Sequence, residues 1–235
     1  MLAFHEIGFR AGRRLHGVEE DYRKRVDMIR NATLALVSFL IGFAFAGAGS
    51  RFIERQDMIV KEANAIGTAW LRAVMLPEPQ KSELRVALKQ YAADRSELVK
   101  NYDSDDFPVL LAKAVGAQKR VWQAGVAGVG SDRQLVNFVM PPLNDVIDSH
   151  SAHLSAAHRH VPTLIIVVIV IMAALAMGMV GYDNGLVRKR YILLSCVFGL
   201  IAATSLWMTI DLDRPRHGLI RVSDRPYVDL VLYME

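Results

Sequence analysis

The chain has 235 residues, 52% of them hydrophobic, and a formal net charge of +4 at pH 7. Residues 51–160 hold 14 Lys/Arg and 13 Asp/Glu, so the excess of positive charge lies outside them, in residues 1–30 and 183–190. These basic residues flank apolar segments and are not interleaved with aromatic residues. This pattern indicates that they contact anionic lipid headgroups, and it argues against binding of nucleic acid.

Residues 1–30 are expected to be a basic N-terminal segment, and residues 31–50 form the first of three windows without a charged residue. The other two windows are residues 161–182 and 191–210. About 20 helical residues cover the roughly 30 Å hydrocarbon core of a bilayer. The sequence therefore predicts an all-α integral membrane bundle of three transmembrane helices.

Residues 51–160 are expected to form a helical extramembrane domain inserted between the first and second spans. Apolar residues recur in it at intervals of three and four, and no alternating strand pattern is present. Pro77 and Pro79 should end its first helix, and Ser131 should cap its fourth. The adjacent Pro141 and Pro142 should kink or break that fourth helix.

The second and third spans are joined by a short basic loop, residues 183–190, and a C-terminal tail of residues 211–235 follows. Arg188, Lys189 and Arg190 make this loop costly to translocate, so the positive-inside rule places it in the cytoplasm. The helical domain then lies on the extracytoplasmic side, although four arginines in the C-terminal tail favour the opposite orientation.

Small residues recur every fourth position within the spans. Such ladders allow close approach of helix backbones, a main route to helix packing in lipid. The predicted helix-packing residues are Gly42, Ala46, Ser50, Ala174, Gly178, Ser195, Gly199 and Ala203. These residues are expected to lie at helix contacts, either within one chain or between subunits that surround a pore.

Two long blocks, residues 62–79 and 211–223, together with residues 6–14 and the first span, closely resemble the bacterial bestrophin-like domain family of integral membrane proteins. The resemblance implies a bacterial inner membrane location. It also implies a distant likeness to bestrophins, which are oligomeric anion channels, although no bestrophin pore motif matches residue by residue. Family members usually carry a further span before residues 6–10, so the resemblance implies either a truncated start or a three-span variant.

Charged residues near the ends of the first and third spans are candidates for a pore mouth or for interfacial anchoring. These ends are expected on one side of the membrane, where acid and base can pair. Charges at span ends routinely act as anchors and ion pairs, and the alternative is a vestibule that selects ions. The set is Arg51, Glu54, Arg55, Arg72, Asp211, Asp213 and Arg214.

A candidate polar face follows the first span on the same predicted helix. It consists of Glu62, Asn64, Gly67 and Thr68. This face is expected either to pack against a second copy of the chain or to line a permeation route.

Histidines form the last candidate cluster, close before the second span. On a continuous helix, His150, His153 and His160 would share a broad face. Plain interfacial packing, a pH-responsive role and transition-metal binding remain open for them. Their spacing is wide for a metal and no cysteine contributes, so the sequence predicts no metal site.

The chain lacks a phosphate-binding glycine loop, a nucleophile elbow and an HExxH motif, so we predict neither an enzyme nor a cofactor. Two functional hypotheses remain. The first is a homo-oligomeric ion channel in the lipid bilayer. The second is a non-conducting membrane scaffold or sensor whose helical domain binds a partner.

Overall fold

The structure is a computed structural model that describes residues 1–235 except 16–18, 103, 158, 215–217 and 235. Helices make up its regular secondary structure, and the described residues contain no strand. The chain divides into two compact units. Unit 1 comprises Met1–Ser50 and His160–Arg214, and unit 2 comprises Arg51–Arg159 and Pro215–Glu235.

Three of the described helices are long and apolar enough to cross a membrane, and each covers all or nearly all of one predicted window. They are α2 (Glu20–Arg72), α6 (Thr163–Leu186) and α7 (Ile192–Asp213). This confirms an all-helical chain with three candidate spans. Helix α2 continues without interruption well beyond its apolar window because no proline or helix-ending glycine follows until Pro77.

Unit 1 packs α2, α6 and α7 around a small apolar core. Val37, Ile41 and Ala44 of α2 meet Ile169, Ala173 and Ala176 of α6, together with Leu206 of α7. Polar side chains also join α2 to the end of α6. The Tyr22 and Tyr182 hydroxyls lie 2.7 Å apart, and Arg30 pairs with Asp183.

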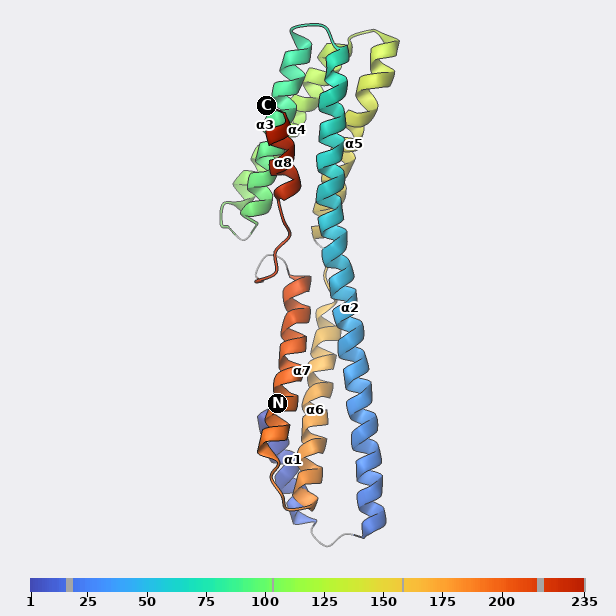
Figure 1. The fold of residues 1–235 in the computed structure, drawn as a ribbon, viewed down its shortest axis with the longest axis vertical. Coiled ribbons are helices and arrows are strands. Elements are labelled where there is room, and N and C mark those ends of the chain that lie inside the picture. Colours follow the sequence, from blue (N-terminus) through green and yellow to red (C-terminus); the bar gives the residue numbers. More distant parts are fainter. Residues whose placement is uncertain (16–18, 103, 158, 215–217, 235) are drawn as a thin grey trace. The chain divides into compact units, whose positions relative to one another are not determined.

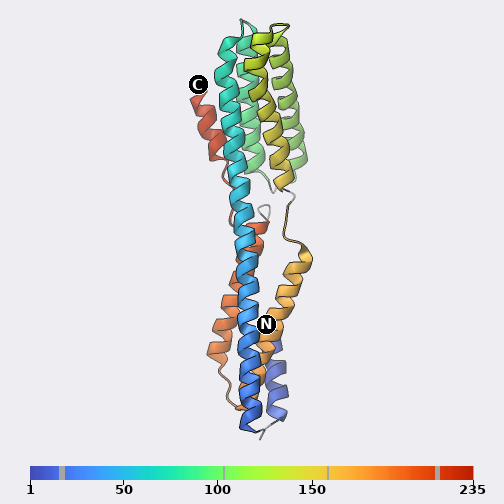
Figure 2. The ribbon, with the colours of Figure 1, turned by 90° about the vertical axis from the view of Figure 1, so that its right-hand side faces the viewer.

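A short helix, α1 (Leu2–Arg14), packs along the second half of α6, as both views show (Figures 1 and 2). Glycines permit the close approach of the two backbones. A Cβ atom on Gly8 would lie 1.9 Å from the carbonyl oxygen of Gly178, and one on Gly181 would lie 2.0 Å from that of His5. The basic N-terminal segment therefore contains a helix that is packed into unit 1.

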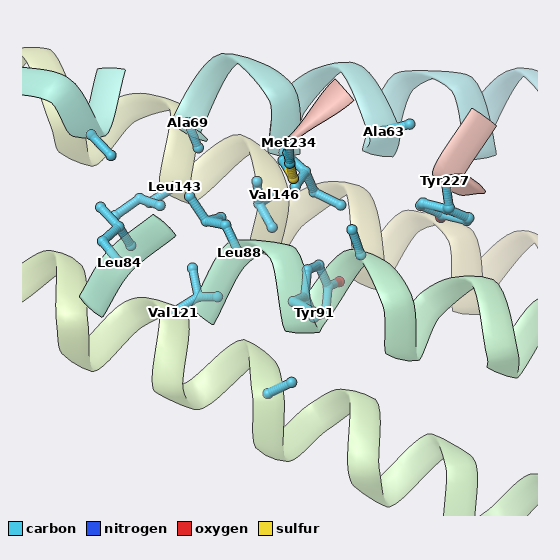
Figure 3. Close-up of a cluster of buried hydrophobic side chains, with 14 of the residues drawn as sticks. Ala63, Ala69, Leu84, Leu88, Tyr91, Val121, Leu143, Val146, Tyr227 and Met234 are labelled. Carbon is cyan, nitrogen blue, oxygen red and sulfur yellow. The ribbon is translucent and has the colours of Figure 1, made fainter. Parts of the chain in front are cut away.

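Unit 2 contains α3 (Gln80–Lys100), α4 (Phe107–Val129), α5 (Arg133–Ala157), α8 (Arg225–Tyr233), the later part of α2 and the short 3-10 helix η1 (Ala73–Met75). Apolar side chains from these helices point toward one another and form its core, including Leu84 and Leu88 of α3, Val121 of α4 and Leu143 of α5 (Figure 3). Helix α8 lies beside α3 and contributes Tyr227 to this core (Figure 1).

Helix α5 corrects two details of the sequence prediction. The break allowed at Pro141 and Pro142 does not occur, because the helix continues through both prolines. Proline at 142 cannot donate to the carbonyl of Phe138, and Arg72 Nη1 donates to that oxygen instead, at 3.0 Å. Asp132 supplies the cap expected from Ser131, because its Oδ1 accepts the amides of the second and third residues of α5.

Candidate functional site

A buried ion pair lies inside the helical core of unit 2. Glu62 of α2 and Arg95 of α3 have side-chain exposures of 0% and 1%. Arg95 Nε donates to Glu62 Oε1 at 2.7 Å, and Arg95 Nη2 donates to Oε2 at 2.8 Å. This two-pronged geometry is the strongest form of a carboxylate–guanidinium contact.

Two tyrosine hydroxyls complete the coordination of the carboxylate. Tyr91 of α3 donates to Glu62 Oε1 at 2.6 Å, and Tyr227 of α8 donates to Oε2 at 2.6 Å. Each carboxylate oxygen thus accepts two hydrogen bonds, which offsets the cost of removing the charge from water. In Figure 3 both tyrosines project into the packed interior, from α3 and from the C-terminal segment respectively.

Two histidines of α5 lie against this arrangement. Arg95 Nη2 is a donor and lies 2.7 Å from His153 Nδ1, so this ring nitrogen accepts and the ring proton sits on Nε2. Since the Tyr91 hydroxyl donates to Glu62, it accepts from His150 Nδ1, at 3.1 Å. His150 Nε2 is then an unprotonated, buried nitrogen without a hydrogen-bond partner among the described residues. We call these six residues of four helices the Glu62 cluster.

The protonation states within the Glu62 cluster follow from burial and charge. Burial alone would raise the pKa of Glu62, but the positive charge and hydrogen bonds of Arg95 outweigh it and hold that pKa well below its ordinary range. Burial, followed by the positive charge of Arg95, lowers the pKa of His150 to about 4. Near neutral pH the cluster therefore contains a carboxylate, a guanidinium and a neutral His150 ring.

Acid is expected to destabilise unit 2 through His150. In the unfolded chain this ring titrates near its ordinary pKa of about 6.5. Its folded pKa is about 4, so between these pH values the unfolded state binds more protons and stability falls as the pH is lowered. Each pH unit can cost at most about 1.4 kcal/mol. Below the ordinary pKa of Glu62 the depressed folded pKa of that carboxyl acts in the same direction.

The measurement is the thermal midpoint of the full chain in detergent between pH 7 and pH 4.5. We expect His150→Phe, which keeps a ring but cannot titrate, to lose less stability over this range than the unsubstituted chain. An identical loss in both proteins would show that His150 does not cause the acid sensitivity.

Three members of the Glu62 cluster were not among the predicted site residues: Tyr91, Arg95 and Tyr227. Tyr91 lies in a stripe of α3 whose other large apolar members are Leu84, Leu88 and Leu98. Arg95 was the signal in the sequence that could have indicated a buried charge. It lies four residues after Tyr91 and three before Leu98, so it places a charge within the same apolar stripe. Tyr227 carries no comparable signal, because a nine-residue helix has too few turns to define a stripe.

The predicted polar face after the first span is not a single face. Glu62 is fully buried, whereas Asn64 and Thr68 are exposed, because positions 62 and 64 lie about 200° apart around a helix. Thr68 bonds the carbonyl of Asn64 within α2. Gly67 faces α8, where an added Cβ would lie 3.2 Å from Leu230.

The three predicted histidines also separate. Helix α5 ends at Ala157, so no continuous helix carries His160 onto the face of His150 and His153. His160 belongs to unit 1, where its Nδ1 donates to the carbonyl of Asp213 at 2.9 Å. Only His150 and His153 come together, at the buried Glu62 carboxylate.

The candidate charges at the span ends fall in both units. In unit 2, buried Arg55 donates to the carbonyl of Arg159 at 2.7 Å, Glu54 pairs with the Arg159 side chain at 3.4 Å, and Arg72 bonds Phe138. Partly buried Arg51 also belongs to unit 2.

In unit 1, the carboxylate of Asp213 accepts the amide of Val161 at 2.9 and 3.0 Å, so it joins the end of α7 to the segment before α6. Asp211 is buried and Arg214 is exposed.

The predicted small-residue ladders take different positions in unit 1. Ala174 and Gly178 of α6 are partly or fully buried, and Gly178 meets α1. On α7, Ser195 bonds His5 Nε2 at 3.0 Å, a Cβ added at Gly199 would lie 3.5 Å from the end of the Met177 side chain, and Ala203 is exposed.

The third ladder, Gly42, Ala46 and Ser50 of α2, is exposed along its whole length. A Cβ added at Gly42 would have no atom within 4 Å. Beside it, a mainly apolar groove of about 380 Å³ runs between α2 and α7, bounded by Val37, Gly42, Ile201 and Ser205 among others.

The sequence profile of the family described as Bestrophin-like domain matches residues 9–227. The fold is similar to the crystal structure of a bacterial bestrophin homologue from Klebsiella pneumoniae, with a TM-score of 0.63, 13% identity, and 98% of each chain covered. A W252A variant of that homologue matches with a TM-score of 0.63, 14% identity, and coverage of 87% of this chain and 81% of the other. No curated protein sequence matches the chain. At this level of identity the structural likeness establishes the fold alone.

Proposed function

Because the chain belongs to the Bestrophin-like domain family, we propose that it is a homo-oligomeric ion channel of a bacterial inner membrane. Bestrophins are the oligomeric anion channels that the sequence resembles at a distance. The fold shared with the bacterial bestrophin homologue over almost the whole chain supports this proposal.

The observation that carries the proposal is the exposed ladder of α2. Gly42, Ala46 and Ser50 are exposed, and no atom lies within 4 Å of a Cβ added at Gly42. Small residues in a span favour close approach of another helix, which a second copy of the chain would provide. The mainly apolar groove between α2 and α7, which Gly42 lines, has a volume of about 380 Å³ and can receive side chains of such a helix.

In this proposal unit 2 is the extramembrane domain and residues 31–50, 161–182 and 191–210 cross the bilayer. The basic loop at Arg188, Lys189 and Arg190 favours a cytoplasmic position for that loop, and hence an extracytoplasmic position for unit 2. The charges at the span ends, together with exposed Asn64 and Thr68, remain the candidates for the mouth of the permeation route.

Ala46→Trp tests the assembly. An indole at this exposed position would block close approach of a neighbouring helix while leaving the interior of unit 1 unchanged. We expect native mass spectrometry of the protein in detergent to show an oligomer for the unsubstituted chain and smaller species for the variant. Leu200→Trp on α7, where Leu200 is 68% exposed, is the matched control and should stay oligomeric. Equal assembly of both variants would contradict this use of the ladder.

Conductance in planar bilayers tests the activity. The unsubstituted chain and Leu200→Trp should conduct, and Ala46→Trp should be silent. A purified protein that is silent across pH and salt would argue against a channel. If it is also monomeric in detergent and crosslinks to one different protein, the scaffold or sensor hypothesis replaces this one.

A further inference from the structure

Two basic segments that are far apart in the sequence meet at one end of unit 1. One is the last turn of α1, and the other is the loop that follows α6. A Cβ atom on Gly185 would lie 2.8 Å from the backbone nitrogen of Arg13, so the two backbones touch three residues before Arg188. The Arg190 guanidinium lies 4.3 Å above the Phe9 ring and 3.2 Å from the Glu6 carboxylate, which holds the loop against α1.

The positive charge at this end exceeds the negative charge available to it. Glu6 is paired with both Arg10 and Arg190. Four further cations are exposed and have no carboxylate within ion-pair distance in the described parts of the chain; they are Arg13, Arg14, Arg188 and Lys189. We call these four the basic end. Held together by the packed helices, they attract anions more strongly than isolated surface charges would.

Arg188 occupies a backbone position that ordinarily suits glycine. Its φ is +56°, in the left-handed region. The Lys189 amide donates to the carbonyl of Asn184 and the Arg188 amide donates to that of Gly185, so the end of α6 is a Schellman motif with Arg188 at the left-handed position. An arginine here is conformationally less favourable than glycine, and the backbone geometry alone does not explain it.

The outward side of α1 carries exposed apolar residues in its first two turns and arginines toward its end. Phe4 and Ile7 are 44% and 64% exposed and form an apolar flank. Arg14 follows Ile7 by seven residues, so at about 100° per residue it lies on nearly the same face, about 10 Å further along the helix. An apolar flank that ends in basic residues suits a helix at the boundary between acyl chains and headgroups.

We propose that the basic end is a binding site for an anionic phospholipid. Its phosphate contacts Arg13, Arg14, Arg188 and Lys189, and its acyl chains lie along Phe4 and Ile7. Guanidinium groups bind phosphate oxygens in pairs, which suits the three arginines, and the exposed apolar flank distinguishes a lipid from a free phosphate. The site is independent of whether the protein conducts ions.

The test uses the full chain reconstituted in phosphatidylcholine vesicles that contain either spin-labelled phosphatidylglycerol or spin-labelled phosphatidylcholine. Electron spin resonance gives the fraction of each label immobilised by the protein, and hence a relative association constant. The unsubstituted chain should prefer phosphatidylglycerol. Each basic residue near an anionic surface accounts for at most about fivefold, so Arg188→Gly should lower the preference by several fold and Arg13→Gln with Arg14→Gln should lower it further.

Arg188→Gly separates binding from folding. Glycine suits the left-handed position, so the thermal midpoint of this variant should be unchanged or higher while its lipid preference falls. Lys119→Gln, which removes an exposed charge of α4, should leave the preference intact. Inorganic phosphate added at constant ionic strength should not compete.

Three results would each overturn the assignment. They are the absence of a preference in the unsubstituted chain, a preference that survives loss of these arginines, and displacement of the lipid by free phosphate.

Discussion

We expect Glu62→Ala to lower the free energy of unfolding of the protein by about 3–5 kcal/mol. The substitution leaves Arg95 charged and 1% exposed without its carboxylate, and it removes the acceptor of two buried tyrosine hydroxyls. Fluorescence of Trp70 and Trp122, both in unit 2, reports this unfolding in detergent when Trp207 of unit 1 is first replaced by Phe.

Two further variants test whether the loss of stability comes from the uncompensated buried charge. Glu54→Ala removes a carboxylate whose 3.4 Å pair with Arg159 is solvent-exposed, and it should cost less than about 1 kcal/mol. Glu62→Met combined with Arg95→Met removes both charges, and it should be more stable than Glu62→Ala because no uncompensated charge remains. A double variant that is less stable than the single one would contradict the buried-charge explanation.

Gly181→Ala should separate α1 from α6. The new methyl group would lie 2.0 Å from the carbonyl oxygen of His5 and 2.7 Å from its carbon, and backbone atoms cannot rotate away as a side chain can. Overpacking of this kind costs about 1–3 kcal/mol, so the N-terminal helix should open locally. Trypsin should then cut faster at Arg10, Arg13 and Arg14, which is measured by the rate of appearance of the shortened chain.

Gly116→Ala in α4 is the matched control. The nearest atom to its added Cβ is the end of a flexible arginine side chain at 3.8 Å. Because the methyl group fits and alanine is a better helix former than glycine, this substitution should raise the free energy of unfolding by about 0.5–1 kcal/mol. It should leave the rate of tryptic cleavage in α1 unchanged. Equal effects of the two alanines would mean that the α1–α6 contact is not as tight as the structure indicates.

The three candidate spans were predictable because a bilayer imposes a length and excludes charge. The windows 31–50, 161–182 and 191–210 each coincide, to within two residues at their starts, with part of one long helix of the structure. The continuity of α5 was not predictable from its own residues. Whether Pro141 and Pro142 break a helix depends on whether the freed carbonyls find donors, and Arg72 comes from 66 residues earlier in the chain.

The Glu62 cluster was only partly accessible to sequence reasoning. Glu62 stood among the candidates, but as part of a polar face with Asn64, Gly67 and Thr68 and without a partner inside the chain. A carboxylate is almost never fully buried unless it is paired. Arg95, its partner, is 33 positions away on another helix. Pairings of this kind arise from tertiary packing, for which a single sequence has no periodic signal.

The bond between Tyr227 and Glu62 has a consequence for biosynthesis. The two residues are 165 positions apart, and all of α6 and α7 lies between them. A ribosome must therefore translate both later apolar segments before it reaches the hydroxyl that completes the Glu62 cluster. Until then Glu62 lacks one of its four donors, so unit 2 reaches its final stability only after the rest of the chain has been made.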